Sequence, residues 1–421
     1  MPDSPTILIR AGAVRDARGL NARPGAIALR EGKVIAGGEP SQVRREAGEP
    51  DRVIDLPDSL VMPAMVNAHA HLDLTGIGPQ PYAGDFIQWI ERVMRERPTD
   101  DAAITKAVQR GLRQSREAGV GVVGDIAGSI AAIRARFAMG YQMPRGISYL
   151  ECFGLGRNEP VAADQARRRR MQLIDELDST FPDDWPFLIG LEAHAPYSAG
   201  LALYDEACEQ GCGHASTHLA ETLAELEFVR DGTGPFAELL RRLGKWDDSI
   251  RGTGLSPVQH LAPILEKGDW VIAHCNYVTD DDIATLAAMA TVAVTVAYCP
   301  VASDYFGHRN HRYRQMIEAG INVCLGTDSI LCQPADEKQP LGILPQMRHV
   351  YRRDRTDPDL LLAMATVRGR LPFNYWPEGS FERGMRGQFL HVRFDAQDDT
   401  DALVQVLLND EPALPVALDP V

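Results

Sequence analysis

Five side chains of the types that hold a catalytic metal follow one another along the chain, each at the end of an apolar, β-type segment. His69 and His71 are separated by one residue, so the period-2 alternation of a strand points both imidazoles to the same side. His218, His274 and Asp328 end three later segments of this kind. Catalytic zinc sites use such ligands and keep a position open for water. We therefore expect these five residues to bind a divalent metal, zinc in the first place and iron as the alternative.

The segments that carry these residues form a regular series. Apolar, β-branched runs followed by turn residues predict eight strands, at residues 60–68, 120–125, 146–151, 187–192, 215–219, 270–274, 292–298 and 322–326. Amphipathic stretches between them predict helices at residues 86–97, 102–118, 161–177 and 305–319. Eightfold strand–helix alternation predicts an α/β fold, a (β/α)8 TIM barrel whose active site lies at the C-terminal ends of the strands.

The polar residues of the series lie at those ends. Besides the five candidate ligands, Asp125, Glu151, His194 and the Cys299–Pro300 pair end predicted strands. A single histidine in an apolar strand is more often a packed core residue than a ligand. Core histidines have no reason to collect on one face of a barrel, so the set favours a functional site.

Both ends of the chain predict a second, smaller domain. Short alternating segments at residues 6–14, 26–36 and 52–56 precede the barrel, and another at 387–394 follows it. We therefore expect a small β-sandwich domain built from residues 1–58 and 372–421, and a catalytic barrel domain over residues 59–371.

Composition excludes several classes of partner. The net charge of -15 opposes binding to nucleic acid, because binding a polyanion requires clustered cations. The seven cysteines form no CxxC pair, and the first residues show no signal-peptide pattern, so we expect a reduced, cytoplasmic protein. The uncharged stretch 284–302 is broken by Pro300 and is expected to form a helix and a strand, not a membrane span. The expected partner is a small-molecule heterocyclic amine. The sequence leaves open whether the chain forms a homo-oligomer.

The order of these residues resembles the amidohydrolase superfamily, in its branch of cytosine, guanine and adenosyl-nucleoside deaminases. The resemblance spans essentially the whole chain and rests on His69-x-His71, on His218 with Glu221 three residues later, and on His274 and Asp328. Binuclear members bridge two ions with a lysine of the fourth strand. Residues 187–192 contain no lysine, so the resemblance implies one metal.

The segment from Thr217 to Glu221 resembles the deaminase signature, in which a glutamate moves protons. Deamination of an aromatic ring requires a protonated ring nitrogen, and Glu221 is the expected acid. His274 and Asp328 are expected to accept the proton of water, and His274 to stabilise the new oxygen. The following Glu225 and Glu227 are expected to be exposed.

Other residues match substrate contacts of this branch. His194 corresponds to a substrate-orienting histidine, and Trp89 lies in an F-x-x-W stretch that covers the pocket. Arg157, in the loop after the third predicted strand, is a candidate to meet a substrate carboxylate, and an exposed loop arginine without such a role is the open alternative. Asp85 is a candidate for the ribose hydroxyls, but Gln88 departs from the acid expected near there and leaves ribose recognition open.

Residues 218–236 and 297–308 resemble the aminodeoxyfutalosine deaminase group, which acts on an adenine-containing nucleoside of menaquinone biosynthesis. The first alternative is a deaminase of S-adenosylhomocysteine, methylthioadenosine or adenosine. A hydrolase of a cyclic amide or of a chlorinated heterocycle uses the same scaffold. A binding protein without catalysis is a third class, against which the intact set of ligands argues.

Overall fold

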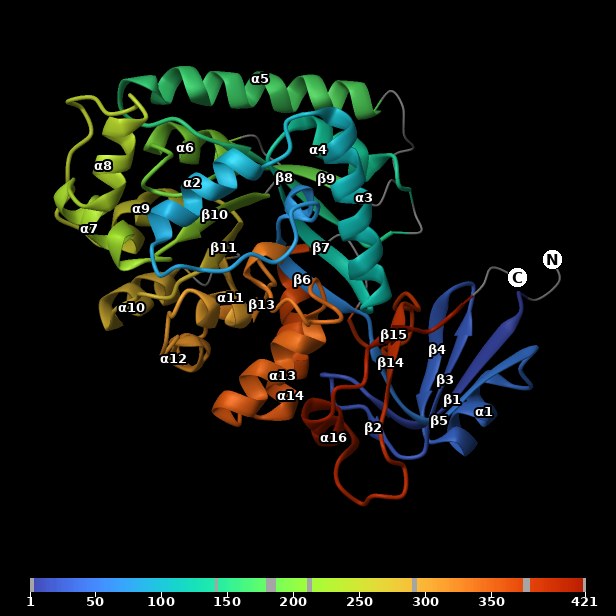
Figure 1. Ribbon diagram of the computed structural model, residues 1–421. Coiled ribbons are helices and arrows are strands. Elements are labelled where there is room, and N and C mark those ends of the chain that lie inside the picture. The colour runs from blue at the N-terminus through green and yellow to red at the C-terminus, as the bar shows by residue number, and fades with distance from the viewer. Residues whose placement is uncertain are drawn as a thin grey trace. The chain divides into compact units, whose positions relative to one another are not determined.

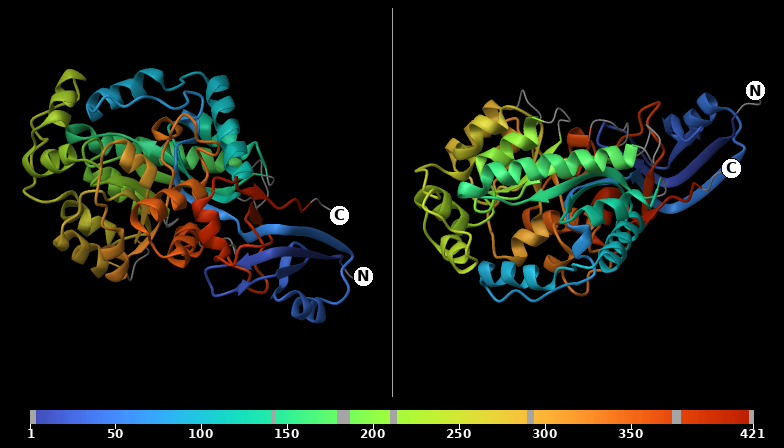
Figure 2. Two further views of the ribbon diagram at one scale, coloured as in Figure 1. Left: turned by 60° about the horizontal axis from the view of Figure 1, so that its bottom comes forward. Right: turned by 90° about the horizontal axis from the view of Figure 1, so that it is seen from above.

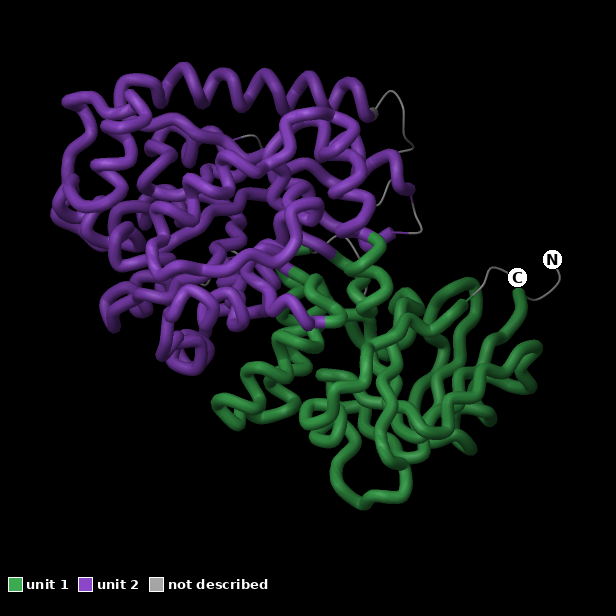
Figure 3. The backbone as a smooth tube through the Cα atoms, viewed as in Figure 1, with its two compact units in different colours: residues 1–67, 113–122, 338–421 green, residues 68–112, 123–337 purple. Residues whose placement is uncertain are grey.

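The computed structural model describes residues 4–140, 143–178, 187–209, 214–289, 294–373 and 379–418. The chain forms two compact units (Figure 3). One comprises residues 1–67, 113–122 and 338–421, and the other residues 68–112 and 123–337. The division expected from the sequence, with a barrel domain over residues 59–371, stays a prediction.

Eight strands follow one another in space in the order of the sequence (Figure 1). They are β6 (Met65–Ala70), β7 (Val120–Ala127), β8 (Arg145–Cys152), β9 (Phe187–Ala193), β10 (Ala215–Leu219), β11 (Trp270–His274), β12 (Val294–Tyr298) and β13 (Asn322–Leu325). Ala70 bridges Asp328 in parallel, and the backbone N–H groups of Thr327 and Asp328 both donate to the His69 carbonyl at 3.0 Å. These contacts join the last strand to the first, and the expected (β/α)8 barrel is confirmed.

Helices follow most of these strands. They include α2 (Phe86–Glu96), α3 (Asp101–Glu117), α4 (Ile130–Phe137), α5 (Glu159–Asp178), α6 (Leu201–Glu209), α7 (Leu223–Asp231), α8 (Pro235–Arg242), α9 (Pro257–Leu265), α10 (Asp280–Ala288), α11 (Pro300–Tyr305), α12 (Tyr313–Glu318), α13 (Ile343–Asp354), α14 (Pro358–Ala365) and α15 (Val367–Arg370). The long helix α5 lies along β8 and β9 (Figure 2). The described residues include no helix that is long and apolar enough to span a bilayer.

Two predicted elements of the barrel have different bounds. The helix expected at 305–319 is wrong in extent, because Gly307 and Asn310 have positive φ and separate α11 from α12. The strand expected at 60–68 is two strands. Its first part belongs to β5 (Arg52–Pro63), and the hydrogen-bond partner changes at Ala64, whose N–H donates to Gln388 before that of Met65 donates to Gly119.

The second sheet contains segments from both ends of the chain, as expected. It has seven strands, β1 (Thr6–Arg15), β2 (Asn21–Ala22), β3 (Gly25–Arg30), β4 (Lys33–Gly38), β5, β14 (Phe389–Arg393) and β15 (Leu414–Pro415). The single strand expected at 26–36 is the hairpin of β3 and β4, because Glu31 and Gly32 both adopt positive φ and reverse the chain. An apolar cluster that includes Val43 and Ala47 packs α1 (Pro40–Ala47) against this sheet, and α16 (Ala402–Leu408) precedes β15.

Candidate metal centre and active site

The five expected metal ligands lie together in the second unit, at strand ends of the barrel. Ligand atoms of His69, His71 and His218 all lie within 4.8 Å of one another, and the centroid of the His69 ring is 5.4 Å from that of His274. Oδ1 of Asp328 lies 3.5 Å from His71 Nε2 and 4.0 Å from His69 Nε2. The geometry therefore brings together four imidazoles and one carboxylate that are far apart in the sequence.

The chemistry of these donors fits a divalent cation. Both ring nitrogens of His69, Nδ1 of His71 and Nε2 of His274 are buried and have no hydrogen-bond partner among the described residues. An unpaired buried polar atom is costly, so each such atom needs an explanation. Burial lowers the pKa of all three histidines well below the usual value, which leaves neutral imidazoles with a lone pair for a metal.

Backbone conformation at this site is unusual. Ala220, His274 and Asp328 follow or end strands β10, β11 and β13, and their φ angles are 51°, 73° and 59°. This left-handed region costs a residue with a Cβ roughly 1–2 kcal/mol. Such outliers persist where surrounding contacts hold them, and they cluster at functional sites.

Glu221 is buried beside the candidate ligands, with Oε1 at 3.6 Å from His274 Nε2. Its carboxyl group and ligand atoms of His274 and Asp328 lie within 4.8 Å of one another. Burial raises the pKa of Glu221 to about 8, so the group carries a proton at neutral pH. A protonated carboxyl beside a metal site is suited to donate a proton to a bound molecule.

Glu192 is a functional candidate that the sequence analysis missed. It lies on β9, is fully buried, and its Oε1 is 3.1 Å from Nδ1 of His218. The carbonyl of His194 lies at 3.1 Å from the same nitrogen. A partner at Nδ1 orients an imidazole and leaves Nε2 for a metal. The signal in the sequence was a glutamate within an otherwise apolar strand.

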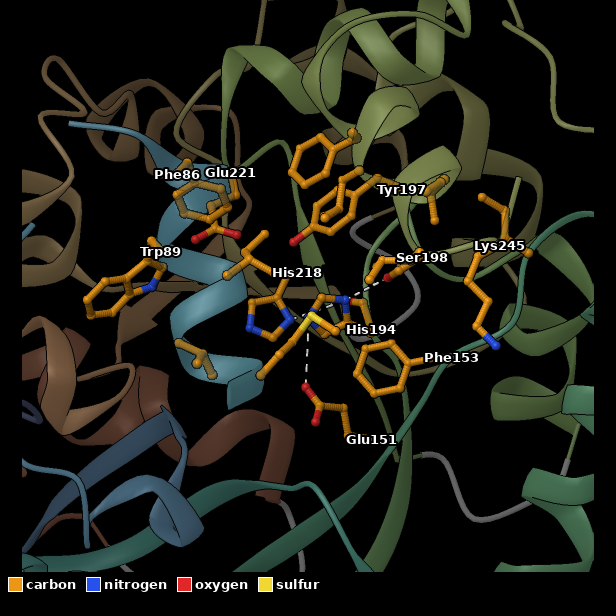
Figure 4. Close-up of a pocket in the computed structure, with 18 of the residues that line it drawn as sticks. Phe86, Trp89, Glu151, Phe153, His194, Tyr197, Ser198, His218, Glu221 and Lys245 are labelled. Atoms are coloured by element: carbon orange, nitrogen blue, oxygen red, sulfur yellow. Dashed lines mark hydrogen bonds and ion pairs between the residues drawn. The ribbon is translucent and has the colours of Figure 1, made fainter. Parts of the chain in front are cut away.

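A cavity of about 930 Å³ opens over these residues, within the second unit. His71, His218, Glu221 and Asp328 line it together with aromatic side chains. The aromatic lining residues are Phe86, Trp89, Phe153, Tyr197, Phe236, Trp246 and Phe306. Figure 4 labels the first four of them. All three expected substrate contacts, His194, Trp89 and Arg157, are among the lining residues.

His194 is held from two sides (Figure 4). Its Nδ1 lies 2.6 Å from Ser198 Oγ, and its Nε2 lies 3.7 Å from Oε1 of Glu151. Arg97, which the sequence analysis did not single out, donates to Glu151 at 2.6 Å and to Asp73 at 3.0 Å. This ion-pair network gives the cavity a polar wall next to His194.

Asp85 and Gln88 do not line the cavity. Oδ1 of Asp85 accepts the N–H groups of Ile87 and Gln88 at 2.9 and 3.1 Å and caps α2, and its Oδ2 accepts the Gln88 amide at 3.0 Å. The geometry therefore gives Asp85 a role as helix cap, and a role in ribose binding receives no support.

Glu225 is fully buried, so the expectation that it is exposed was wrong.

Two cations lie at the cavity away from the histidines. The Arg157 side chain is 76% exposed, and its Nε is 4.0 Å from Oδ1 of Asp247. Lys245, which the sequence analysis did not single out, also lines the cavity (Figure 4). Either side chain can meet an anionic group of a bound molecule.

A parallel barrel that holds four histidines, an aspartate and a buried glutamate at its strand ends is suited to metal-assisted hydrolysis. The model of the amidohydrolase family matches residues 60–402, and the chain belongs to this family. It is a hydrolase that acts on carbon–nitrogen bonds.

Two curated relatives are similar over most of their length. The chain is 28% identical over 384 residues to an aminodeoxyfutalosine deaminase of Deinococcus radiodurans, and the match covers 85% of each protein. It is 22% identical over 378 residues to a 5-methylthioadenosine/S-adenosylhomocysteine deaminase of Halalkalibacterium halodurans, covering 85% of the chain and 77% of the relative.

Solved structures share the fold. Helicobacter pylori aminofutalosine deaminase in complex with methylthio-coformycin superposes with a TM-score of 0.79 at 18% identity, over 96% of the chain and 97% of that structure. Atrazine chlorohydrolase of Arthrobacter aurescens, complexed with zinc, gives a TM-score of 0.73 at 19% identity, over 96% and 91%.

Proposed function

We propose that the chain is a deaminase with one zinc ion, and that it converts a 6-aminopurine nucleoside of the aminodeoxyfutalosine type to the 6-oxo nucleoside. The observation that carries the proposal is the position of the buried Glu221 carboxyl, beside His274 and Asp328 and at the cavity. The likeness to the Deinococcus radiodurans aminodeoxyfutalosine deaminase supports this substrate class. Such a substrate would place the reaction in menaquinone biosynthesis.

His69, His71, His218, His274 and Asp328 would hold the metal. A divalent ion in such a site lowers the pKa of a bound water towards neutrality. The five lysines of the chain all lie outside β9, so the bridging group of a two-metal centre is missing from that strand. This absence favours one metal per chain.

The side chains of the site divide the proton transfers of the reaction. Glu221 donates a proton to the ring nitrogen, which makes the amine-bearing carbon electrophilic. Asp328 accepts the proton that water gives up, and His274 stabilises the oxygen that forms on the ring carbon. Overall, the oxygen of one water molecule replaces the amino group on the ring carbon. The amino group takes up a proton that these side chains return and leaves as ammonia.

The cavity fits a nucleoside with an extension better than a free base. Its volume of about 930 Å³ lies near the upper end of the usual range for a small-molecule site. The aromatic lining can stack on a purine, and His194 is positioned to orient the ring or the ribose. Arg157 and Lys245 would contact a carboxylate at the far end of the substrate, and binding energy gained there helps to position the purine.

Ammonia release across a panel of substrates tests the proposal. The panel contains aminodeoxyfutalosine, methylthioadenosine, S-adenosylhomocysteine, adenosine, adenine, guanine, cytosine and a chlorotriazine. We expect kcat/KM to be highest for the carboxylated nucleoside. Arg157→Ala and Lys245→Ala should weaken substrates that carry a carboxylate and leave adenosine nearly unchanged. A preference for a free base, or release of chloride in place of ammonia, would refute the nucleoside assignment.

A second candidate is deamination of methylthioadenosine or S-adenosylhomocysteine, which the Halalkalibacterium halodurans relative favours. Methylthioadenosine has an uncharged extension. If it is the best substrate of the panel and both cation variants leave its kcat/KM unchanged, this candidate replaces the first.

A further inference from the structure

Glu225 makes contacts that the proposed reaction does not use directly. It lies in the first turn of α7 and is 0% exposed. Its two carboxylate oxygens accept two consecutive backbone N–H groups, those of Ala220 at 2.7 Å and of Glu221 at 2.8 Å. Its own N–H donates to Oγ1 of Thr222 at 3.2 Å, which caps the helix. A buried carboxylate thus holds the backbone of the residue that carries the acid.

The carbonyl groups of the same segment accept hydrogen bonds from other residues. Nδ2 of Asn276 donates to the Glu221 carbonyl at 3.1 Å, and Oγ of Ser303 donates to Oδ1 of Asn276 at 2.8 Å. The Ala220 carbonyl accepts the N–H of Tyr277 at 3.0 Å. Both the N–H and the carbonyl groups of Ala220 and Glu221, between β10 and α7, are therefore hydrogen-bonded.

These contacts offset backbone strain at Ala220. Its φ of 51° lies in the left-handed region, which costs alanine roughly 1–2 kcal/mol. Without its hydrogen bonds the residue would relax to a right-handed or extended conformation. The next residue is Glu221, so such a relaxation would turn its carboxyl away from His274.

We propose that Glu225, together with Asn276, is a positioning residue for the proton donor. It holds the peptide groups of Ala220 and Glu221 in the conformation that keeps the Glu221 carboxyl beside His274. The inference rests on the proposed role of Glu221 as acid. Glu225 is neither one of the candidate metal ligands nor a residue that lines the cavity.

Glu225→Gln tests the inference with little change of volume. The amide keeps one acceptor, but its NH2 group faces the second backbone N–H and cannot accept from it. Misplacement of a catalytic group by about 1 Å can cost on the order of 100-fold in rate. We expect kcat to fall by about that factor, while KM and the zinc content per chain stay close to the unchanged protein.

Asp282→Asn is the matched control. Asp282 is 1% exposed and lies in the first turn of α10, where its Oδ2 accepts the N–H of Thr279 at 2.8 Å. Like Glu225, it is a buried carboxylate in a first helical turn that accepts a backbone N–H, but the segment before α10 carries no proton donor. Both variants should lower Tm, but only Glu225→Gln should lower kcat. An equal fall of kcat in both would overturn a specific positioning role.

A double-mutant cycle separates positioning from general destabilisation. If Glu225 acts through Glu221, Glu225→Gln should cost no further activity in a Glu221→Gln background. Losses that multiply, or a normal kcat in Glu225→Gln, would overturn the inference. If Glu225→Gln does not fold, Asn276→Ala replaces it, because this variant removes the hydrogen bond to the Glu221 carbonyl. It should lower kcat in the wild-type background and cost no further activity in the Glu221→Gln background. Normal activity of Glu221→Gln alone would instead refute the proposed function.

Discussion

At the scale of single residues, the two carboxyl groups of the site, those of Glu221 and Asp328, differ in pKa. Burial raises the pKa of Glu221 to about 8 and that of Asp328 to about 6, and the neighbouring His218 opposes the rise in both. At pH 7 the first therefore carries a proton and the second is ionised. Pairs of carboxyl groups whose pKa values are moved apart serve as acid and base at one site.

Glu221→Gln should abolish most of the deamination and keep the metal. The amide preserves the shape of the side chain but has no proton to transfer, and general acids contribute about 100 to 10,000-fold in rate. Ammonia release and zinc content per chain measure the two effects. Glu227→Gln is the control, since Glu227 lies on α7, which follows Glu221, and accepts a hydrogen bond from Thr233 at 3.0 Å. Near-normal turnover by the first variant would move the chemistry to another acid.

The sequence predicted residues of the site whose identity and spacing form a pattern. His69-x-His71, His218 with Glu221, His274 and Asp328 belong to it, and the barrel brings them together. Glu192, Glu225 and Arg97 could not be found in this way, because their roles depend on partners that the fold supplies. Glu225 follows Glu221 by four residues, and only its burial distinguishes it from a solvated glutamate.

At the scale of elements, β7, β8 and α4 are joined by a buried arginine. Arg136 is fully buried and donates to the carbonyl groups of Val123 at 2.8 Å and Ile147 at 2.9 Å. It lies 3.8 Å from Oδ2 of Asp125, whose Oδ1 accepts the N–H of Leu72 at 3.2 Å. The arginine therefore links two barrel strands to the segment that follows His71.

Arg136→Ala should lower the free energy of unfolding by about 3–5 kcal/mol, because it leaves Asp125 as an uncompensated buried charge. Arg134→Ala on the same helix is the comparison. Arg134 pairs with Glu176 at 2.6 Å, and both side chains are more than 40% exposed, so its loss should cost at most about 1 kcal/mol. Urea unfolding measures both. Equal effects would contradict the structural role of Arg136.

The strands of the barrel were predictable because parallel strands that are buried on both faces appear in the sequence as nearly continuous apolar runs. The misplaced bounds lie where the chain reverses without a strong signal. Glu31 and Asn310 adopt positive φ although neither is glycine, so the hairpin of β3 and β4 and the break after α11 were not anticipated. The sequence also gave no sign that the strand partner changes at Ala64.

At the scale of the whole molecule, the chain ends form one sheet, while every residue of the candidate site belongs to the second unit. The ligands come from β6, β10, β11 and the end of β13, so a bound ion would link strands that are distant in the sequence. Metal binding to the folded chain alone must then add to its stability.

Zinc should raise Tm, and a chelator should lower it. A ligand at about 1,000 times its Kd adds on the order of 4 kcal/mol to the folded state. Thermal unfolding with zinc and with chelator measures the shift. The double variant His69→Ala/His71→Ala should show none, whereas His391→Ala, which changes a histidine of the other sheet, should keep it. A shift that survives loss of both ligands would place the metal elsewhere.

Titration of the metal-free protein with zinc tests the central claim most directly, with deamination of the preferred nucleoside as the readout. The account predicts that activity rises in proportion to bound zinc and levels off at one ion per chain, and that Glu221→Gln binds the same ion without gaining activity. Full activity in the metal-free protein, or a rise that continues to two ions per chain, would contradict it.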